Sequence, residues 1–90
     1  MTLQNLKYML EISNSHSFSK AKNLFVSQST LSAAVKELES DLGITIFKRT
    51  NRGVSLTYDG EDFIKYAKEI VEQSQYLEQR YHARKSLPMR

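Results

Sequence analysis

Residues 26 to 43 read VSQSTLSAAVKELESDLG, and this stretch decides the fold. Its larger apolar residues recur at intervals that place them on one face of an α-helix; they are Leu31, Val35, Leu38 and Leu42. Ser27 stands directly before this pattern, where serine is a favourable N-cap, and Gly43 follows it, where glycine suits the left-handed residue that ends a helix. The pattern therefore predicts a helix over residues 28–42.

The segment before this helix predicts two more helices. Leu3, Leu6 and Leu10 follow helical spacing, so we expect a first amphipathic helix from residue 3 to about 14. Ser17 is a suitable N-cap for a short second helix that stops near Val26. Because only a brief connection then leads into the helix at 28–42, the chain predicts a helix-turn-helix over about residues 18–37.

The segment after Gly43 changes to a β pattern. Residues 44–47 are β-branched and aromatic, and residues 54–57 form a second short candidate strand. Between them lies KRTNRG, which contains three cations together with asparagine and glycine. We therefore expect a β-hairpin over about residues 44–57 with a cationic tip, which we call the wing.

Thr57 can cap a last, long helix over residues 58–84, with acidic residues in its first turns and basic residues near its end. Apolar positions follow a heptad seam along it, and they predict a dimer interface made of Phe63, Ala67, Ile70, Val71, Ser74, Leu77 and Tyr81. Packing within the chain is the alternative explanation for Phe63, Ile64 and Ala67. The fold class is thus mainly α: a winged helix-turn-helix of three helices plus a two-stranded β-wing in residues 1–58, followed by a long dimerisation helix.

Composition excludes several classes of protein. The chain has 90 residues, enough for one compact domain, and contains no cysteine, which excludes a disulfide scaffold and a cysteine-ligated zinc site. We expect no metal site and no catalytic residue: His16 and His82 lack ligand clusters, and the serines lack a histidine and acid partner set. No transmembrane span or signal peptide is predicted, so we expect a soluble cytoplasmic protein without a membrane partner.

The net charge of +3 conceals a segregation of charge along the chain. Residues 12–36 and residues 42–58 each carry three Lys or Arg and no Asp or Glu. If the fold brings these stretches together, they form one positive face typical of a protein that binds a polyanion. Lysines scattered over an ordinary surface are the alternative interpretation of the charge alone.

The helix at 28–42 is the candidate to enter the major groove of DNA. Its first turn presents Gln28, Ser29, Thr30 and Ser32, whose side chains can hydrogen-bond to base edges. The amides at its amino terminus also favour a phosphate. From these residues alone, an ordinary capped helix start is an equally good interpretation.

The chain resembles the amino-terminal DNA-binding domain of the LysR-type transcriptional regulators from residue 3 to about 84. The matching motifs are SFSKA at 17–21, VSQSTLS at 26–32, LE at 38–39, LG at 42–43, IFKR at 46–49, Arg52, and LT with Gly60. The resemblance implies a dimer, and a tetramer of the full-length protein, that binds double-stranded DNA with the wing on the minor groove or backbone. The resemblance implies contacts to bases or phosphates from Ser27, Gln28, Ser29, Thr30, Ser32, Arg49 and Arg52. Because some polar positions of the family are alanine here, we expect binding to depend more on Lys20, Lys36, Lys48 and the wing.

The chain also departs from the family pattern. It is one residue short after Ala21, it has Ser29 and Thr30 where the family often has Pro-Ala, and Ala33 and Ala34 stand where polar or basic residues are frequent. The family continues into a domain that senses a small-molecule effector, so we expect no cofactor in this chain. Residues 85–90, with Pro88, read as the start of a hinge, which favours a fragment over a natural short protein.

Two rival functions remain open at this stage. A winged-helix module that only pairs with protein would not need the acid-free basic segments. A regulator of the multiple-antibiotic-resistance type is disfavoured, because its dimer helices come from both ends of a longer chain.

Overall fold

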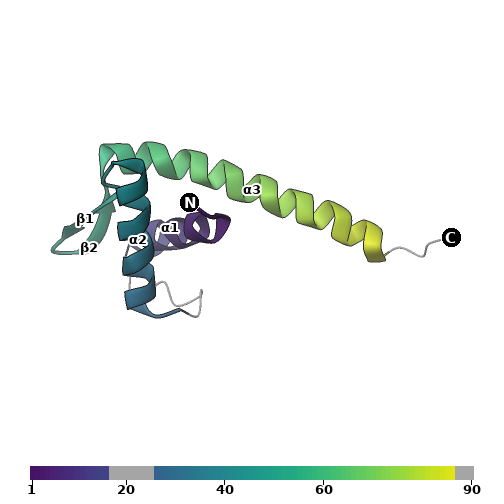
Figure 1. The fold of residues 1–90 in the computed structure, drawn as a ribbon, viewed down its shortest axis with the longest axis horizontal. Coiled ribbons are helices and arrows are strands. Elements are labelled where there is room, and N and C mark those ends of the chain that lie inside the picture. Colours follow the sequence, from purple (N-terminus) through teal and green to yellow (C-terminus); the bar gives the residue numbers. More distant parts are fainter. Residues whose placement is uncertain (17–25, 87–90) are drawn as a thin grey trace.

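The computed structural model describes residues 1–16 and 26–86, and Figure 1 shows their arrangement. Helix α1 (Leu3–Ser15) begins where the Thr2 hydroxyl accepts a hydrogen bond from the backbone N–H of Asn5, at 3.1 Å. It ends at His16, which has φ 57° and donates its backbone N–H to the carbonyl of Ile12. The predicted first helix is confirmed.

Helix α2 (Gln28–Leu42) has the predicted bounds and the predicted caps. The Ser27 hydroxyl accepts from the backbone N–H of Thr30 at 3.1 Å, and Gly43 has φ 70°. Leu31, Val35 and Leu38 are its buried residues. The second helix predicted by the sequence falls on residues 17–25, which lie outside the part of the chain that the structure describes.

The wing is a two-stranded antiparallel sheet of β1 (Phe47–Thr50) and β2 (Gly53–Leu56). Phe47 pairs with Leu56, and Thr50 pairs with Gly53 across the turn. The prediction of a strand at 44–47 was therefore wrong by three residues, and half of the six-residue basic segment expected in the loop, residues 48–50, belongs to β1. The turn itself is Asn51 and Arg52.

Side chains outside the sheet explain why residues 44–46 are not part of the ladder. The Glu39 carboxylate accepts from the backbone N–H of Ile46 at 2.6 Å and from that of Phe47 at 3.2 Å. The Thr57 hydroxyl donates to the carbonyls of Thr45 and Ile46. These contacts satisfy backbone groups that a strand partner would otherwise satisfy, so the segment needs no ladder.

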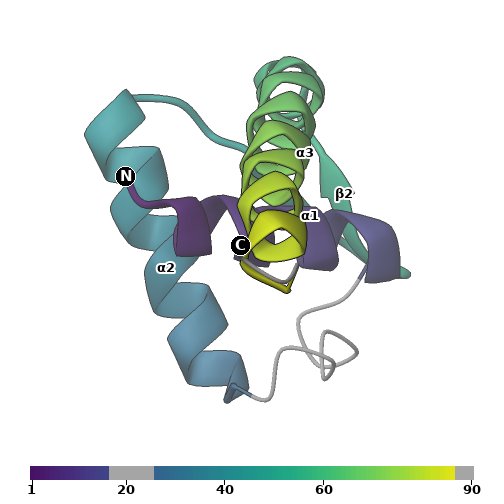
Figure 2. The same cartoon turned by 90° about the vertical axis from the view of Figure 1, so that its right-hand side faces the viewer.

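Helix α3 (Tyr58–Ser86) is one continuous helix of 29 residues. Thr57 caps it as predicted, its hydroxyl accepting from the backbone N–H of Gly60 at 2.9 Å. At 1.5 Å per residue the helix is about 43 Å long, and its carboxyl-terminal half runs away from the rest of the molecule (Figures 1 and 2). The helix continues two residues past the predicted end at 84.

Two clusters of buried side chains hold these elements together. The larger one joins α1, α2 and the wing through Met9, Ile12, Leu31, Val35, Leu38, Ile46, Phe47 and Val54. The smaller one joins α1 to α3 through Leu6, Ala67 and Val71. Since all these groups are apolar, the hydrophobic effect dominates the packing. None of the helices within residues 1–16 and 26–86 is long and apolar enough to cross a membrane.

Candidate nucleic-acid interface

The amino-terminal turn of α2 faces the solvent. Ser27, Gln28, Ser29 and Thr30 are all exposed, whereas Ser32 is half-buried. The first amides of a helix lack partners within the helix, and the macrodipole adds positive potential at the same end. This turn therefore combines exposed polar side chains with a preference for a negatively charged group.

The hydroxyl groups of this turn form a small cluster. Besides capping the helix, Ser27 Oγ lies 3.0 Å from Ser29 Oγ and 2.8 Å from Thr30 Oγ1. An arriving base or phosphate would compete with these internal hydrogen bonds. Gln28 has a longer side chain with both a donor and an acceptor, and so it is the residue of this turn best suited to a bidentate contact with a base.

The side of α2 that faces away from the core carries a second group of predicted contacts. A shallow surface hollow is lined by Gln28, Ser29, Ser32, Ala33 and Lys36. Four of the five were predicted DNA contacts. Ala33 was treated only as a lost polar contact, yet it lies on the same face because it is four residues after Ser29.

The predicted cations of the wing are exposed. Lys48 and Arg49 lie in β1, and Arg52 is in the turn that follows it. Thr50 Oγ1 accepts from the backbone N–H of Arg52 at 3.2 Å and contacts the Gly53 carbonyl at 3.4 Å, which orders the turn. The turn therefore holds the backbone of Arg52 in place at the tip of the wing.

A close contact with α1 fixes the position of the wing. The backbone N–H of Val54 donates to the carbonyl of His16 at 3.0 Å. Gly53 has φ 126°, and a Cβ there would lie 2.5 Å from the same carbonyl oxygen. Only glycine satisfies both conditions, because other residues rarely adopt this φ and would collide with the backbone.

Glu39 fixes the position of the wing relative to α2. Its carboxylate joins the last turn of α2 to the residues that enter β1, through the two backbone hydrogen bonds to Ile46 and Phe47. Sequence reasoning noted Glu39 only as part of a motif and did not predict this contact. Glu39 thus connects α2, which carries the exposed polar face, to the cationic wing.

The two basic segments are only partly described. Lys36 on α2 and the three cations of the wing are exposed, while Lys20 and Lys22 lie outside the described residues. In Figure 1 the tip of the wing points to the side opposite the carboxyl-terminal half of α3, and the amino-terminal end of α2 lies at the bottom, far from the start of α3. An extended polyanion could therefore contact α2 and the wing without contacting the carboxyl-terminal half of α3.

The predicted dimer residues divide into two groups. Ala67 and Val71 are buried against α1 of the same chain, and Phe63 is half-buried beside them, so packing within the chain accounts for all three. Ile70, Leu77 and Tyr81 are 47%, 57% and 52% exposed. Ser74 is half-buried. Of the predicted seam, three large apolar side chains therefore remain about half exposed on α3.

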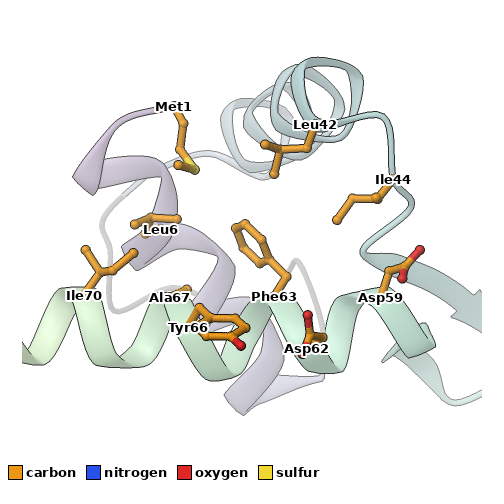
Figure 3. A pocket seen from close by; sticks show the side chains of 10 residues that line it. All are labelled: Met1, Leu6, Leu42, Ile44, Asp59, Asp62, Phe63, Tyr66, Ala67 and Ile70. Atoms are coloured by element: carbon orange, nitrogen blue, oxygen red, sulfur yellow. The ribbon is translucent and has the colours of Figure 1, made fainter.

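An apolar hollow adjoins this exposed surface. Figure 3 shows it between the start of α1, the end of α2 and the first half of α3, with a volume of about 330 Å³. The side chains of Met1, Leu42, Ile44 and Phe63 face it, and Ile70 borders it at the far end from Asp59. The hollow thus continues the exposed apolar side of α3 toward the rest of the domain.

A match between this chain and a protein-family model identifies the family that shares this arrangement. The model described as "Bacterial regulatory helix-turn-helix protein, lysR family" matches residues 3–61, which span α1, α2, the wing and the start of α3. The chain belongs to the LysR family. The resemblance inferred from the sequence motifs is confirmed.

Named relatives agree with LysR membership. This LysR-family chain is 39% identical over 72 residues to an uncharacterised transcriptional regulator, YcgK, of Bacillus subtilis, covering 79% of this chain and 22% of the relative. It is 41% identical over 78 residues to the regulator IlvY of Escherichia coli, covering 86% of this chain and 26% of the relative. The LysR-family chain therefore spans about a quarter of the length of these relatives.

Solved structures confirm the winged-helix fold. The LysR-family chain superposes on the BenM DNA-binding domain in its complex with catB site 1 DNA with a TM-score of 0.89, 29% identity and coverage of 99% of this chain and 100% of that one. For the CbnR DNA-binding domain in complex with DNA, the TM-score is 0.84, with 31% identity and coverage of 92% and 97%. The LysR-type fold with its long final helix is thus shown over nearly the whole chain.

Proposed function

We propose that this chain is the DNA-binding part of a LysR-type transcriptional regulator and that it binds duplex DNA sequence-specifically as a homodimer. One observation carries the proposal: the exposed polar face of α2 and the cationic wing are tied together by Glu39. An α-helix fits the major groove of B-DNA, and cations beside it can neutralise the flanking phosphates. The two similar domains solved in complex with DNA support this assignment.

The residues of this interface have different roles in the proposal. Gln28 and Ser32 would form hydrogen bonds with base edges in the major groove, whereas Lys36, Lys48 and Arg49 would form ion pairs with phosphates. Arg52, at the tip of the wing, would reach the neighbouring minor groove or its backbone. Ser27 would act through the helix that it caps, with the first amides of α2 directed at a phosphate.

The homodimer would form through α3. Ile70, Leu77 and Tyr81 are largely exposed apolar side chains on one side of a helix whose second half is exposed to solvent. The first turns of α3 carry Asp59, Glu61 and Asp62, and its end carries Arg80, Arg84 and Lys85. Two copies aligned antiparallel would bring each acidic start next to a basic end, which Coulomb attraction favours.

The remaining features follow the family and are part of the proposal. The chain itself would hold no cofactor, and a small-molecule effector would bind a different domain of a longer regulator, which would assemble as a tetramer. Relatives are named as transcriptional regulators, so we propose no enzymatic activity. The family model describes bacterial regulators, and binding to bacterial chromosomal DNA would place the protein in the cytoplasm.

Selection of bound sequences from a random duplex pool tests the proposal. We expect enrichment of a site with two related half-sites, because a symmetric dimer reads a symmetric operator. The variant with Gln28→Ala, Lys36→Ala and Arg52→Ala should enrich nothing under the same conditions. If the unmodified chain enriches no sequence, the proposal fails and the rival function, a winged-helix module that only pairs with protein, gains support.

A further inference from the structure

Ala33 and Ser40 are the two residues of α2 that point most directly away from the core, and of these Ala33 lies nearer the amino-terminal turn. The buried stripe of this helix is formed by Leu31, Val35 and Leu38. At about 100° per residue, Ala33 lies nearly opposite the mean direction of these three side chains. It is exposed in the chain. When α2 approaches another molecule with its outer face, Ala33 is therefore at the centre of that face.

The surroundings of Ala33 are polar. It shares its surface hollow with Gln28, Ser29, Ser32 and Lys36, each of which carries a hydrogen-bonding group. Ala33 contributes only a methyl group, and its short side chain lets the backbone of α2 approach closely. The face thus offers one small apolar contact surrounded by donors and acceptors.

Only one group in the major groove of DNA is apolar and so complementary to the methyl group of Ala33. Each base pair presents donors and acceptors there, but thymine alone adds an apolar group, its 5-methyl. We propose that Ala33 packs against the 5-methyl group of a thymine and is a specificity-determining residue of this chain. The inference rests on the proposed function, because it assumes that α2 lies in the major groove.

The polar neighbours strengthen the inference. The hydroxyls of Ser29 and Thr30 are already within hydrogen-bond distance of Ser27 Oγ, at 3.0 and 2.8 Å. Base contacts through these two side chains would cost internal hydrogen bonds, whereas a methyl contact at Ala33 costs none. Apolar contact at Ala33 would therefore contribute a larger part of the free-energy difference by which this face distinguishes one base pair from another.

Deoxyuridine tests the contact, because it differs from thymidine only by the missing methyl group. In the sequence selected by the unmodified chain, each thymidine of a half-site is replaced singly by deoxyuridine, and the dissociation constant is measured at one salt concentration. We expect one replacement to weaken binding about fourfold, the equivalent of transferring one methyl-sized group out of contact. The other replacements should change affinity by less than about twofold.

Variants of the two neighbouring alanines assign the effect to a residue. In the Ala33→Gly variant, the sensitive thymidine and its deoxyuridine counterpart should bind equally well. Ala34→Gly is the matched control, because it loosens the same helix but lies on the half-buried side. It should retain the fourfold difference.

The outcomes separate the two proposals. A chain that selects no sequence contradicts the proposed function itself, and this inference with it. A selected site in which no deoxyuridine replacement matters, or in which the loss persists in Ala33→Gly, leaves the proposed function intact and refutes the role of Ala33. The deoxyuridine series uses the unmodified chain, so a site at which no replacement matters refutes the role of Ala33 even if the glycine variants do not fold.

Discussion

Glu39 Oε2 lies 2.6 Å from the backbone nitrogen of Ile46, so a side chain of α2 holds the segment that leads into the wing. The same oxygen accepts from Phe47 at 3.2 Å. Because the acceptor is a carboxylate, these hydrogen bonds are of the charge-assisted, stronger kind. Glu39 thus adds hydrogen bonds to the apolar packing that already joins α2 to the wing.

Replacing Glu39 with alanine should destabilise the fold. The variant removes the carboxylate that accepts two backbone hydrogen bonds, so we expect the free energy of unfolding to fall by about 1.5 to 3 kcal/mol. Glu37→Ala removes the same charge from an exposed position of the same helix and should change it by less than about 0.5 kcal/mol. Urea denaturation at one protein concentration measures both, and equal losses would contradict the role of Glu39.

Two glycines with positive φ should respond differently to alanine. A Cβ added to Gly43 would have no atom within 4 Å, so Gly43→Ala should cost only the backbone strain of about 1 to 2 kcal/mol. Gly53→Ala adds a collision with the His16 carbonyl, so we expect a larger loss of stability and weaker DNA binding. Thermal unfolding of the two variants side by side checks this order. A Gly53 variant as stable as the Gly43 variant would show that the wing does not need its contact with α1.

The wing arginine should contribute to affinity without regard to sequence. Arg52→Ala removes one cation from the proposed phosphate contacts, so the slope of log K against log salt should fall by about one for selected and random duplexes alike. Lys68→Ala, which removes an exposed cation of α3, is the control and should leave the slope unchanged. An unchanged slope in the Arg52 variant would place the wing outside the interface.

Gln28 should contribute to specificity. A bidentate contact with a base discriminates by about 1 to 3 kcal/mol, so Gln28→Ala should lose that much on the selected site and little on random DNA. Fluorescence anisotropy with both duplexes provides the comparison. Equal losses on both would make Gln28 a phosphate contact.

The exposed stripe of α3 should control association. Ile70→Glu combined with Leu77→Glu places charges in the proposed interface, and we expect a monomer by sedimentation velocity. Gln75→Glu combined with Gln79→Glu adds the same charge to the other side of the helix and should leave a dimer. A dimer that survives the first pair of substitutions would exclude this stripe as the interface.

Local patterns predicted the bounds of α1, α2 and α3 well, and they predicted the two-stranded wing but misplaced its first strand. The bounds of α2 follow from Ser27, Gly43 and a periodic apolar face, all of which act within the helix itself. The position of β1 depends instead on Glu39, eight residues before Phe47, and on the Thr57 hydroxyl. Such contacts between separate elements leave no periodic mark in the sequence, so the predicted strand was displaced by three residues.

The candidate site divides in the same way. The exposed cations of the wing and the polar face of α2 follow from residue type and helical spacing. The hydrogen bonds of Ser27 Oγ with the hydroxyls of Ser29 and Thr30 do not follow from residue type and spacing, because they depend on the torsion angles of these side chains. On α3 the heptad pattern could not separate Val71, which α1 covers, from Leu77, which stays exposed.

The carboxyl-terminal half of α3 extends beyond its own domain, so the folding of this half should be coupled to dimerisation. Every side chain from Gln75 to Arg84 is exposed, and a helix segment of this length is only marginally stable by itself in water. Its amide hydrogens should therefore exchange faster on dilution, while those between Phe63 and Val71, which α1 covers, should not. Protein concentration then sets how much of the helix is ordered.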